Sequence, residues 1–266
     1  MKIDYKETTS DLQTRIDIHN QYGGKDIDAW MLEMLPLKKG VKILDVACGS
    51  GKQCASFYRH LNSDCTIIGG DVSKEMLNQA IENASANGQK IAYQHLDFNK
   101  KFDFPDDSFD LVSCCFAIYY AEDIPFTISE MHRVIKPGGT LFTTGPMPEN
   151  KSIFYDIIRE ATSKHIPRMP GSSRYASEIL DEIKNRFAQT KMEFFENPLV
   201  FKTADPFVAY TRASLSEDRK LWGDFFKDKD DFEKIIDAIL RVSETRIKQH
   251  GEIVMTKVVG GIFATK

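Results

Sequence analysis

Small and acidic residues gather in one run of the sequence, LDVACGSG at residues 44–51. An aspartate, Asp45, precedes three small residues, Ala47, Gly49 and Gly51. Small residues let a ligand approach the backbone, and the amide N–H groups and dipole at the start of a following helix favour a carboxylate or phosphate. The run therefore predicts a binding site for a ligand that has an anionic part.

A second acid, Asp71, follows Gly51 by 20 residues. In doubly wound folds, an acid at this distance accepts hydrogen bonds from ribose hydroxyls, so the pair predicts a nucleoside ligand. The sequence does not match two other glycine-rich motifs that bind nucleotides. A Walker loop needs Ser or Thr where Gln53 stands, and a dinucleotide loop needs Gly or Ala where Lys52 stands.

The elements that must position these residues alternate between strand and helix. Apolar runs predict strands at 41–46, 65–71, 91–96, 109–116 and 140–144. Apolar spacing and caps, with Ser73 as an N-cap and Gly88 just past a helix end, predict helices at about 51–61, 73–87 and 124–135. Such alternation is typical of a doubly wound, mostly parallel α/β sheet.

The flanking segments complete this α/β fold. Residues 11–35 predict two short helices separated by Gly23-Gly24, and residues 149–190 predict helices with a break at 167–173. Later strands at 191–201 and 252–265 bring the sheet to seven, with helices at 205–213 and 230–249 between them. We therefore expect four parts. They are an N-terminal helical lid (1–40), a ligand-binding core (41–146), a helical substrate cap (147–190) and a segment that completes the sheet (191–266).

Composition narrows the function class. The 266 residues are 42% hydrophobic and 28% charged, as in ordinary globular proteins. A protein that binds nucleic acid through its overall charge is usually basic, whereas this chain has a net charge of −4. We therefore expect no nucleic-acid partner. No apolar run is long enough for a bilayer, the start has no apolar signal-peptide core, and the five cysteines have no metal-site spacing. We expect a cytoplasmic protein without a metal or membrane partner, and its oligomeric state stays open.

The motifs together resemble those of the class I S-adenosylmethionine-dependent methyltransferases. The matching runs, in order, are ILDVACGSG, GGDVS, HLDF followed by FPDDSFDLV, and EMHRVIKPGGTLFTTGP, within residues 41–146. This resemblance implies a Rossmann-like fold and S-adenosylmethionine as the cofactor, with S-adenosylhomocysteine as its product. Ala47 departs from the family's usual glycine, and alanine there still allows close approach of a ligand if its φ is negative.

The resemblance also implies residue roles at the two ends of the cofactor. At the methionine end, Asp45 would hold the ammonium directly or through water, the backbone of residues 47–51 would line the methionine, and Cys115 and Phe116 would flank the sulfonium.

At the nucleoside end, Asp71 would accept from both ribose hydroxyls and Val72 would pack on the adenine. Asp97 would accept from the adenine amino group, and the Phe98 backbone would meet the ring edge.

The acceptor side is less marked. Tyr120 is a candidate to orient substrate or assist proton removal, with aromatic packing as the alternative. His165, in the expected cap, is a candidate base, and Tyr22 is a candidate lid contact, with a simple surface helix as the alternative.

The activity implied is methyl transfer to an O or N atom of a small organic acceptor. An RNA or protein methyltransferase and a catalytically silent S-adenosylmethionine-binding module stay open. A nicotinamide-dependent oxidoreductase is disfavoured because the dinucleotide loop is out of register.

Overall fold

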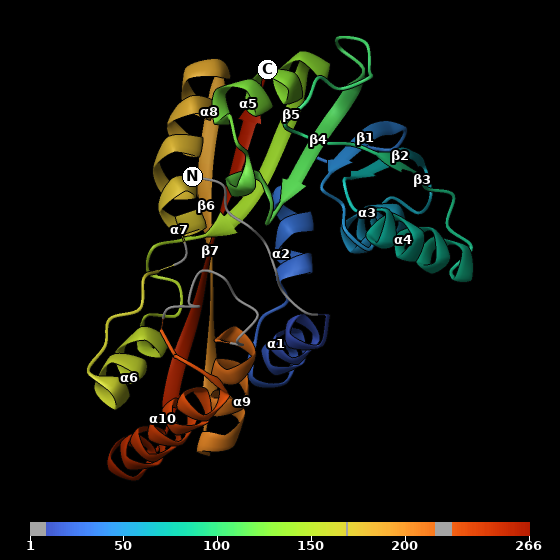
Figure 1. The fold of residues 1–266 in the computed structure, drawn as a ribbon. Coiled ribbons are helices and arrows are strands. Elements are labelled where there is room, and N and C mark those ends of the chain that lie inside the picture. Colours follow the sequence, from blue (N-terminus) through green and yellow to red (C-terminus); the bar gives the residue numbers. More distant parts are fainter. Residues whose placement is uncertain (1–8, 169, 216–224) are drawn as a thin grey trace.

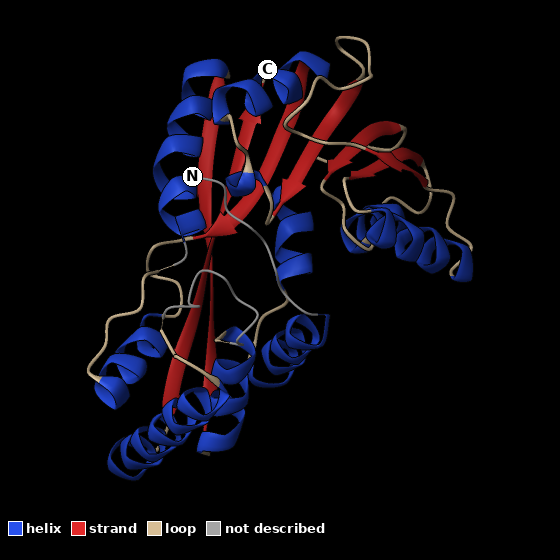
Figure 2. Cartoon of the chain, viewed as in Figure 1, coloured by secondary structure: helices blue, strands red, loops and turns tan. Residues whose placement is uncertain are grey.

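The computed structural model describes residues 9–168, 170–215 and 225–266. Seven strands form one sheet in the order β3-β2-β1-β4-β5-β7-β6, which confirms the predicted seven-stranded, doubly wound architecture (Figures 1 and 2). The strands are β1 (Val41–Val46), β2 (Cys65–Asp71), β3 (Ala92–His95), β4 (Phe109–Cys115), β5 (Ile135–Pro146), β6 (Gln189–Phe201) and β7 (Ile253–Thr265). The first five run parallel, and β7 is antiparallel to both β5 and β6.

Helices connect and cover these strands. They are α1 (Thr9–Tyr22), α2 (Ile27–Met34), α3 (Lys52–His60), α4 (Lys74–Ala86), η1 (Ile118–Tyr120), α5 (Ile124–Val134), α6 (Ser152–Thr162), α7 (Pro170–Arg174), η2 (Tyr175–Ile179), α8 (Leu180–Arg186), α9 (Ala204–Ser214) and α10 (Lys229–His250). Within the described ranges, no helix combines the length and apolarity needed to cross a membrane.

Strand β1 lies between β2 and β4, so the carboxyl ends of these three strands meet at one edge of the sheet. The β1–β2 register pairs Val46 with Gly70, and the β1–β4 register pairs Asp45 with Ser113. The loops predicted to bind the ligand therefore emerge side by side.

The predicted cap of α4 is confirmed, because the Ser73 hydroxyl accepts from the Met76 amide at 3.3 Å.

The last two strands extend past this edge. Strand β7 pairs with β5 only over 259–265, and its remaining residues, 253–258, pair with 196–201 of β6 as a two-stranded ribbon. Helices α1, α6, α9 and α10 gather around this ribbon (Figure 1). We call these helices and the ribbon the ribbon half, and β1–β5 with their connecting helices the sheet half. The carboxyl edge of the parallel strands faces the ribbon half.

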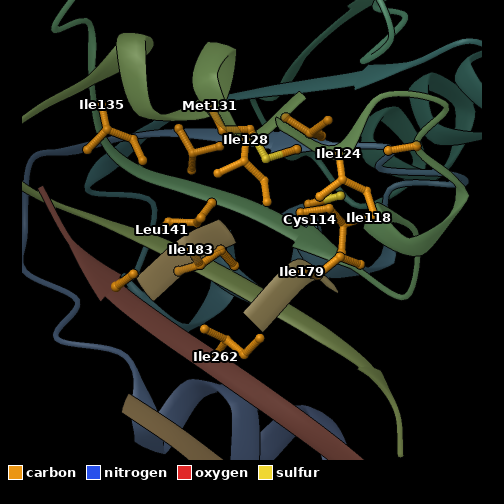
Figure 3. Packing of buried hydrophobic residues seen from close by; sticks show 14 of the residues in the cluster. Cys114, Ile118, Ile124, Ile128, Met131, Ile135, Leu141, Ile179, Ile183 and Ile262 are labelled. Carbon is orange, nitrogen blue, oxygen red and sulfur yellow. The ribbon is translucent and has the colours of Figure 1, made fainter. Parts of the chain in front are cut away.

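The segment expected to form one helical cap, 147–190, is instead divided between the two halves. Helix α6 buries Phe154, Ile157 and Ile158 in the apolar cluster of the ribbon half. In Figure 3, Ile179 and Ile183 lie with Leu141 and Ile262 of the sheet. Both isoleucines are fully buried, so η2 and α8 serve as a covering layer of the sheet.

Two predicted boundaries also change. Strand β5 begins at Ile135, directly after α5, because Ile135 pairs with Phe109 before a bulge restores the register at Leu111 and Thr140. Helix α7 begins at Pro170, inside the predicted break, which is consistent with the preference of proline for the first helical position.

Candidate functional site

The loop after β1 bends through three residues with positive φ. The angles are 57° at Ala47, 53° at Gly49 and 81° at Gly51. A Cβ on Gly49 would meet no atom within 4 Å, so the loop backbone faces open space there. A Cβ on Gly51 would lie 2.5 Å from the Tyr93 hydroxyl, so the protein's own packing requires that glycine. Gly49 is therefore the position where a ligand can approach the backbone.

Ala47 corrects one expectation. Close approach was expected with a negative φ at this alanine, but the structure places it in the left-handed region at 57°. An L-residue other than glycine pays roughly 1 kcal/mol or more for this conformation. The loop is therefore formed with backbone strain at Ala47.

Asp71 joins the loop to the end of β2. Its Oδ2 accepts from the Gly49 amide at 2.9 Å, and its Oδ1 accepts from the Ser73 amide at 2.9 Å. Each carboxylate oxygen has two acceptor sites, so one on each oxygen is left for a ribose hydroxyl. The adjacent Val72 is 61% exposed, which leaves an apolar side chain available for a flat ring. These features fit the nucleoside part of S-adenosylmethionine.

Asp45 lies beneath this loop and is 1% exposed. The Ser113 hydroxyl donates to its Oδ1 at 2.6 Å, and the Cys54 thiol donates to its Oδ2 at 3.3 Å. Burial raises the pKa of Asp45 to about 6, an effect that Asp71 reinforces and the two hydrogen bonds oppose. Asp45 is thus enclosed under the loop, and its role toward the methionine ammonium, direct or through water, stays a prediction.

Asp97 and Phe98 follow β3. Asp97 accepts from the Asn99 amide at 3.0 Å, and Lys100 Nζ lies 3.2 Å from its other oxygen. Burial acts to raise the pKa of Asp97, but these two partners outweigh it and the pKa is lowered. The Phe98 carbonyl accepts from the Thr127 hydroxyl at 3.0 Å. Asp97 thus stabilises its own turn as an ionised group, and its contact with adenine stays a prediction.

Cys115 is the last residue of β4, and Phe116 follows it in the turn that leaves the strand. Burial raises the pKa of the Cys115 thiol, so the side chain stays protonated. Phe116 has a φ of 57° and its amide donates to the Thr144 carbonyl at 2.9 Å, which fixes the turn that leaves the strand. Lys257 Nζ, from β7, lies 5.6 Å from the centroid of the Phe116 ring.

The predicted acceptor-side residues lie in different places. Tyr120 is the last residue of η1, a few residues after β4. It is half-buried, and its ring centroid lies 4.6 Å from that of Tyr119. Arg174 holds this turn by donating to the Tyr119 carbonyl at 2.8 Å. His165 is exposed on the loop after α6, and Tyr22 packs on Phe201 of the ribbon half at 5.1 Å. The structure brings Tyr120 to the carboxyl edge, whereas the roles of His165 and Tyr22 stay predictions.

Two cations of the ribbon half were missed by sequence reasoning. Lys257 lies beside Phe116, and Lys151 is buried at the start of α6. Both act electrostatically on His19 of α1, a helix expected to be either part of a lid or a simple surface helix. Their separation along the chain leaves no spacing signal that could have found them.

Comparisons with known proteins agree with this geometry. Residues 43–139 match the model of a methyltransferase domain family. Over 185 residues, the chain is 34% identical to a demethylmenaquinone methyltransferase of Chlorobaculum parvum, covering 63% of this chain and 73% of that protein. Over 122 residues, it is 33% identical to phosphoethanolamine N-methyltransferase 3 of Arabidopsis thaliana, covering 46% of this chain. The chain spans about a quarter (24%) of the length of that plant protein.

A solved structure shows the same fold. Phosphoethanolamine N-methyltransferase 2 of Haemonchus contortus, in complex with S-adenosyl-L-methionine, superposes with a TM-score of 0.56 at 17% identity, covering 97% of this chain and 57% of that one. The open backbone at Gly49, the spare acceptor sites of Asp71 and the exposed Val72 fit the same cofactor. The chain belongs to the class I S-adenosylmethionine-dependent methyltransferases.

Proposed function

We propose that this protein transfers the methyl group of S-adenosylmethionine to an O or N atom of a small organic acceptor. The observation that carries the proposal is the hydrogen bond from the Gly49 amide to Asp71, which ties an open loop to a ribose acceptor. An N-methyltransferase among the relatives supports the choice of acceptor atom. The relative that acts on demethylmenaquinone supports a small organic acceptor in general.

Each end of the cofactor has its own residues in this proposal. Asp71 binds the ribose, Val72 covers the adenine, and the Gly49 backbone leaves room for the methionine. S-Adenosylmethionine supplies a methyl group on a positively charged sulfonium, so the cofactor itself carries the reactive group. The protein's part is to align the acceptor and exclude water.

Tyr120 is the residue we propose for the acceptor. It follows β4 by a few residues, in a turn that Arg174 clamps through the Tyr119 and Ala121 carbonyls at 2.8 and 3.0 Å. A hydroxyl held in this way can orient a polar acceptor by a hydrogen bond. A neutral amine acceptor needs no base, whereas a hydroxyl acceptor benefits from one, and that is the role left to His165.

Release of S-adenosylhomocysteine tests this proposal. The purified protein is incubated with S-adenosylmethionine and, separately, phosphoethanolamine, demethylmenaquinone, bulk tRNA and a protein extract. We expect release with phosphoethanolamine, an N acceptor, and none with the polymers. Release with demethylmenaquinone alone would place the new methyl group on carbon and contradict the choice of O or N. Release only with a polymer would replace the proposal by the RNA or protein alternative. Binding of S-adenosylhomocysteine without turnover on any acceptor would favour the silent binding module.

A further inference from the structure

Lysine, arginine and histidine side chains from three separate segments converge beyond the carboxyl edge of the sheet. Lys257 lies on β7 two residues before Val259, which pairs with Pro146 at the end of β5. Residue Lys257 therefore lies in the ribbon, just past the end of the pairing with β5. Its Nζ lies 5.6 Å from the centroid of the Phe116 ring. Phe116 is the residue expected to flank the reacting end of the cofactor.

Lys151 enters the same region from the start of α6. Its amide donates to the Thr256 carbonyl at 3.0 Å, so it lies next to Lys257 along β7. The side chain is only 7% exposed, and its Nζ lies 5.0 Å from the Phe154 ring and 5.3 Å from the Tyr210 ring. A lysine enclosed by two aromatic rings is held in place as a fixed positive charge.

Helix α1 adds His19 and Arg15. The His19 ring contacts the Tyr210 ring edge-on at 5.5 Å, so Tyr210 lies between His19 and Lys151. The buried Nδ1 of His19 has no hydrogen-bond partner among the described residues. A buried polar atom of this kind costs free energy unless a ligand or water satisfies it.

The nearby cations and burial disfavour the protonated forms of His19 and Lys257. Burial, with the charges of Lys257, Lys151 and Arg15, lowers the pKa of His19 to about 2. Burial, Arg15 and Lys52 likewise lower the pKa of Lys257 to about 8, although Asp28 acts in the opposite direction. An anion beside Lys257 would offset the cost of burying its charge, and it could also accept a hydrogen bond from the unsatisfied edge of His19.

We infer that Arg15, His19, Lys151 and Lys257 bind an oxyanion, a phosphate or carboxylate, carried by the methyl acceptor. This inference rests on the proposed function and names the acceptor's chemical class. The anion would fix one end of the acceptor in the ribbon half. Its nucleophilic atom would then lie near Phe116, where the cofactor's methyl group is expected.

Calorimetry with two ligands tests this inference. Inorganic phosphate and acetate are titrated into protein saturated with S-adenosylhomocysteine, for the wild type, Lys257→Met, Lys151→Met and the exposed control Lys90→Met. We expect at least one anion to bind the wild type and Lys90→Met equally, and each of the other variants to bind it at least fivefold more weakly. Tighter phosphate binding identifies a phosphorylated acceptor, and tighter acetate binding identifies a carboxylate one.

The affinity for S-adenosylhomocysteine, measured on each variant, separates the other outcomes. We expect it to change less than twofold, which also shows that the variants are folded. A large loss in Lys257→Met with no anion binding would overturn the inference, because the cluster would then hold the cofactor's own carboxylate. Anion binding unaltered in both variants would overturn it as well. Failure of the wild type to bind S-adenosylhomocysteine would instead overturn the proposed function, and the inference with it.

Discussion

The two halves of the molecule present opposite kinds of binding surface. In the sheet half, the ligand would meet backbone held in unusual conformations, with Asp71 fixing the loop at Gly49. In the ribbon half, it would meet long cationic side chains, such as Lys151 and Lys257, set among aromatic rings. The first surface depends on a local loop, and the second depends on tertiary packing. A fold divided in this way can keep one cofactor while its acceptor changes.

A substitution at Gly51 should disturb the loop after β1 most directly. Gly51→Ala should lower the free energy of unfolding by about 2 kcal/mol or more, because the new Cβ would lie 2.5 Å from the Tyr93 hydroxyl and φ is 81°. Urea denaturation measures the loss. Gly49→Ala is the matched control, since it has a similar φ but open space, and should lose only about 1 kcal/mol. Equal losses would contradict the different roles given to these glycines.

Removal of the Asp71 carboxylate should weaken binding of the cofactor product. Asp71→Ala should weaken binding of S-adenosylhomocysteine by more than about 1.5 kcal/mol, which is over tenfold, since the ribose and the Gly49 amide both lose a charged acceptor. Calorimetric titration gives the dissociation constant. Glu82→Ala, an exposed acid on α4, should leave it unchanged. Unaltered affinity in Asp71→Ala would mean that the ribose lies elsewhere.

In the ribbon half, loss of a binding cation should increase stability. Burial lowers the pKa of Lys257 to about 8 in the folded protein, so below pH 8 the fold holds a charge at a cost. Lys257→Met should therefore raise the free energy of unfolding at pH 7 by about 1 kcal/mol. The gain should shrink as the pH rises from about 8 toward about 10.5, where the unfolded chain also loses its proton.

Thermal unfolding at pH 7 and pH 10, with Lys90→Met as the control, measures this gain. A variant less stable than the wild type at pH 7 would show that Lys257 is satisfied within the protein itself, and the contrast between the two halves would fail.

The smallest expected effect is at the boundary between the halves. Tyr120→Phe should lower turnover about threefold, less than 1 kcal/mol, through loss of one hydrogen bond to the acceptor. Affinity for S-adenosylhomocysteine should not change. Tyr119→Phe, its buried neighbour, is the control. Steady-state kinetics measures turnover. An equal change in turnover in both variants would contradict the proposed contact between Tyr120 and the acceptor.

The difference between the halves also explains what could be predicted from the sequence. Strands β1 and β2 match their predicted ranges, and Ser73 caps α4, because buried parallel strands and helix caps depend on short stretches of sequence. The position of Asp71 beside the loop was also predictable, since doubly wound folds place an acid about 20 residues after such a loop. Its hydrogen bond with the Gly49 amide was not predicted.

Features that depend on distant contacts were not predictable in this way. The strand patterns of β6 and β7 do not reveal that half of each strand leaves the sheet as a ribbon. Helices α6 and α8 lie in one segment that was expected to form a single cap, yet the two helices pack in different halves. The cluster of Arg15, His19, Lys151 and Lys257 spans almost the whole chain, and no motif spacing joins its members.

The central claim is that the sheet half binds an adenosylated sulfonium cofactor through its loop and Asp71. Calorimetric titration of the wild-type protein with S-adenosylhomocysteine, with NADH as the control ligand, tests it most directly. The account predicts micromolar binding of S-adenosylhomocysteine and no response to NADH. No binding of S-adenosylhomocysteine, or binding of NADH in its place, would contradict it.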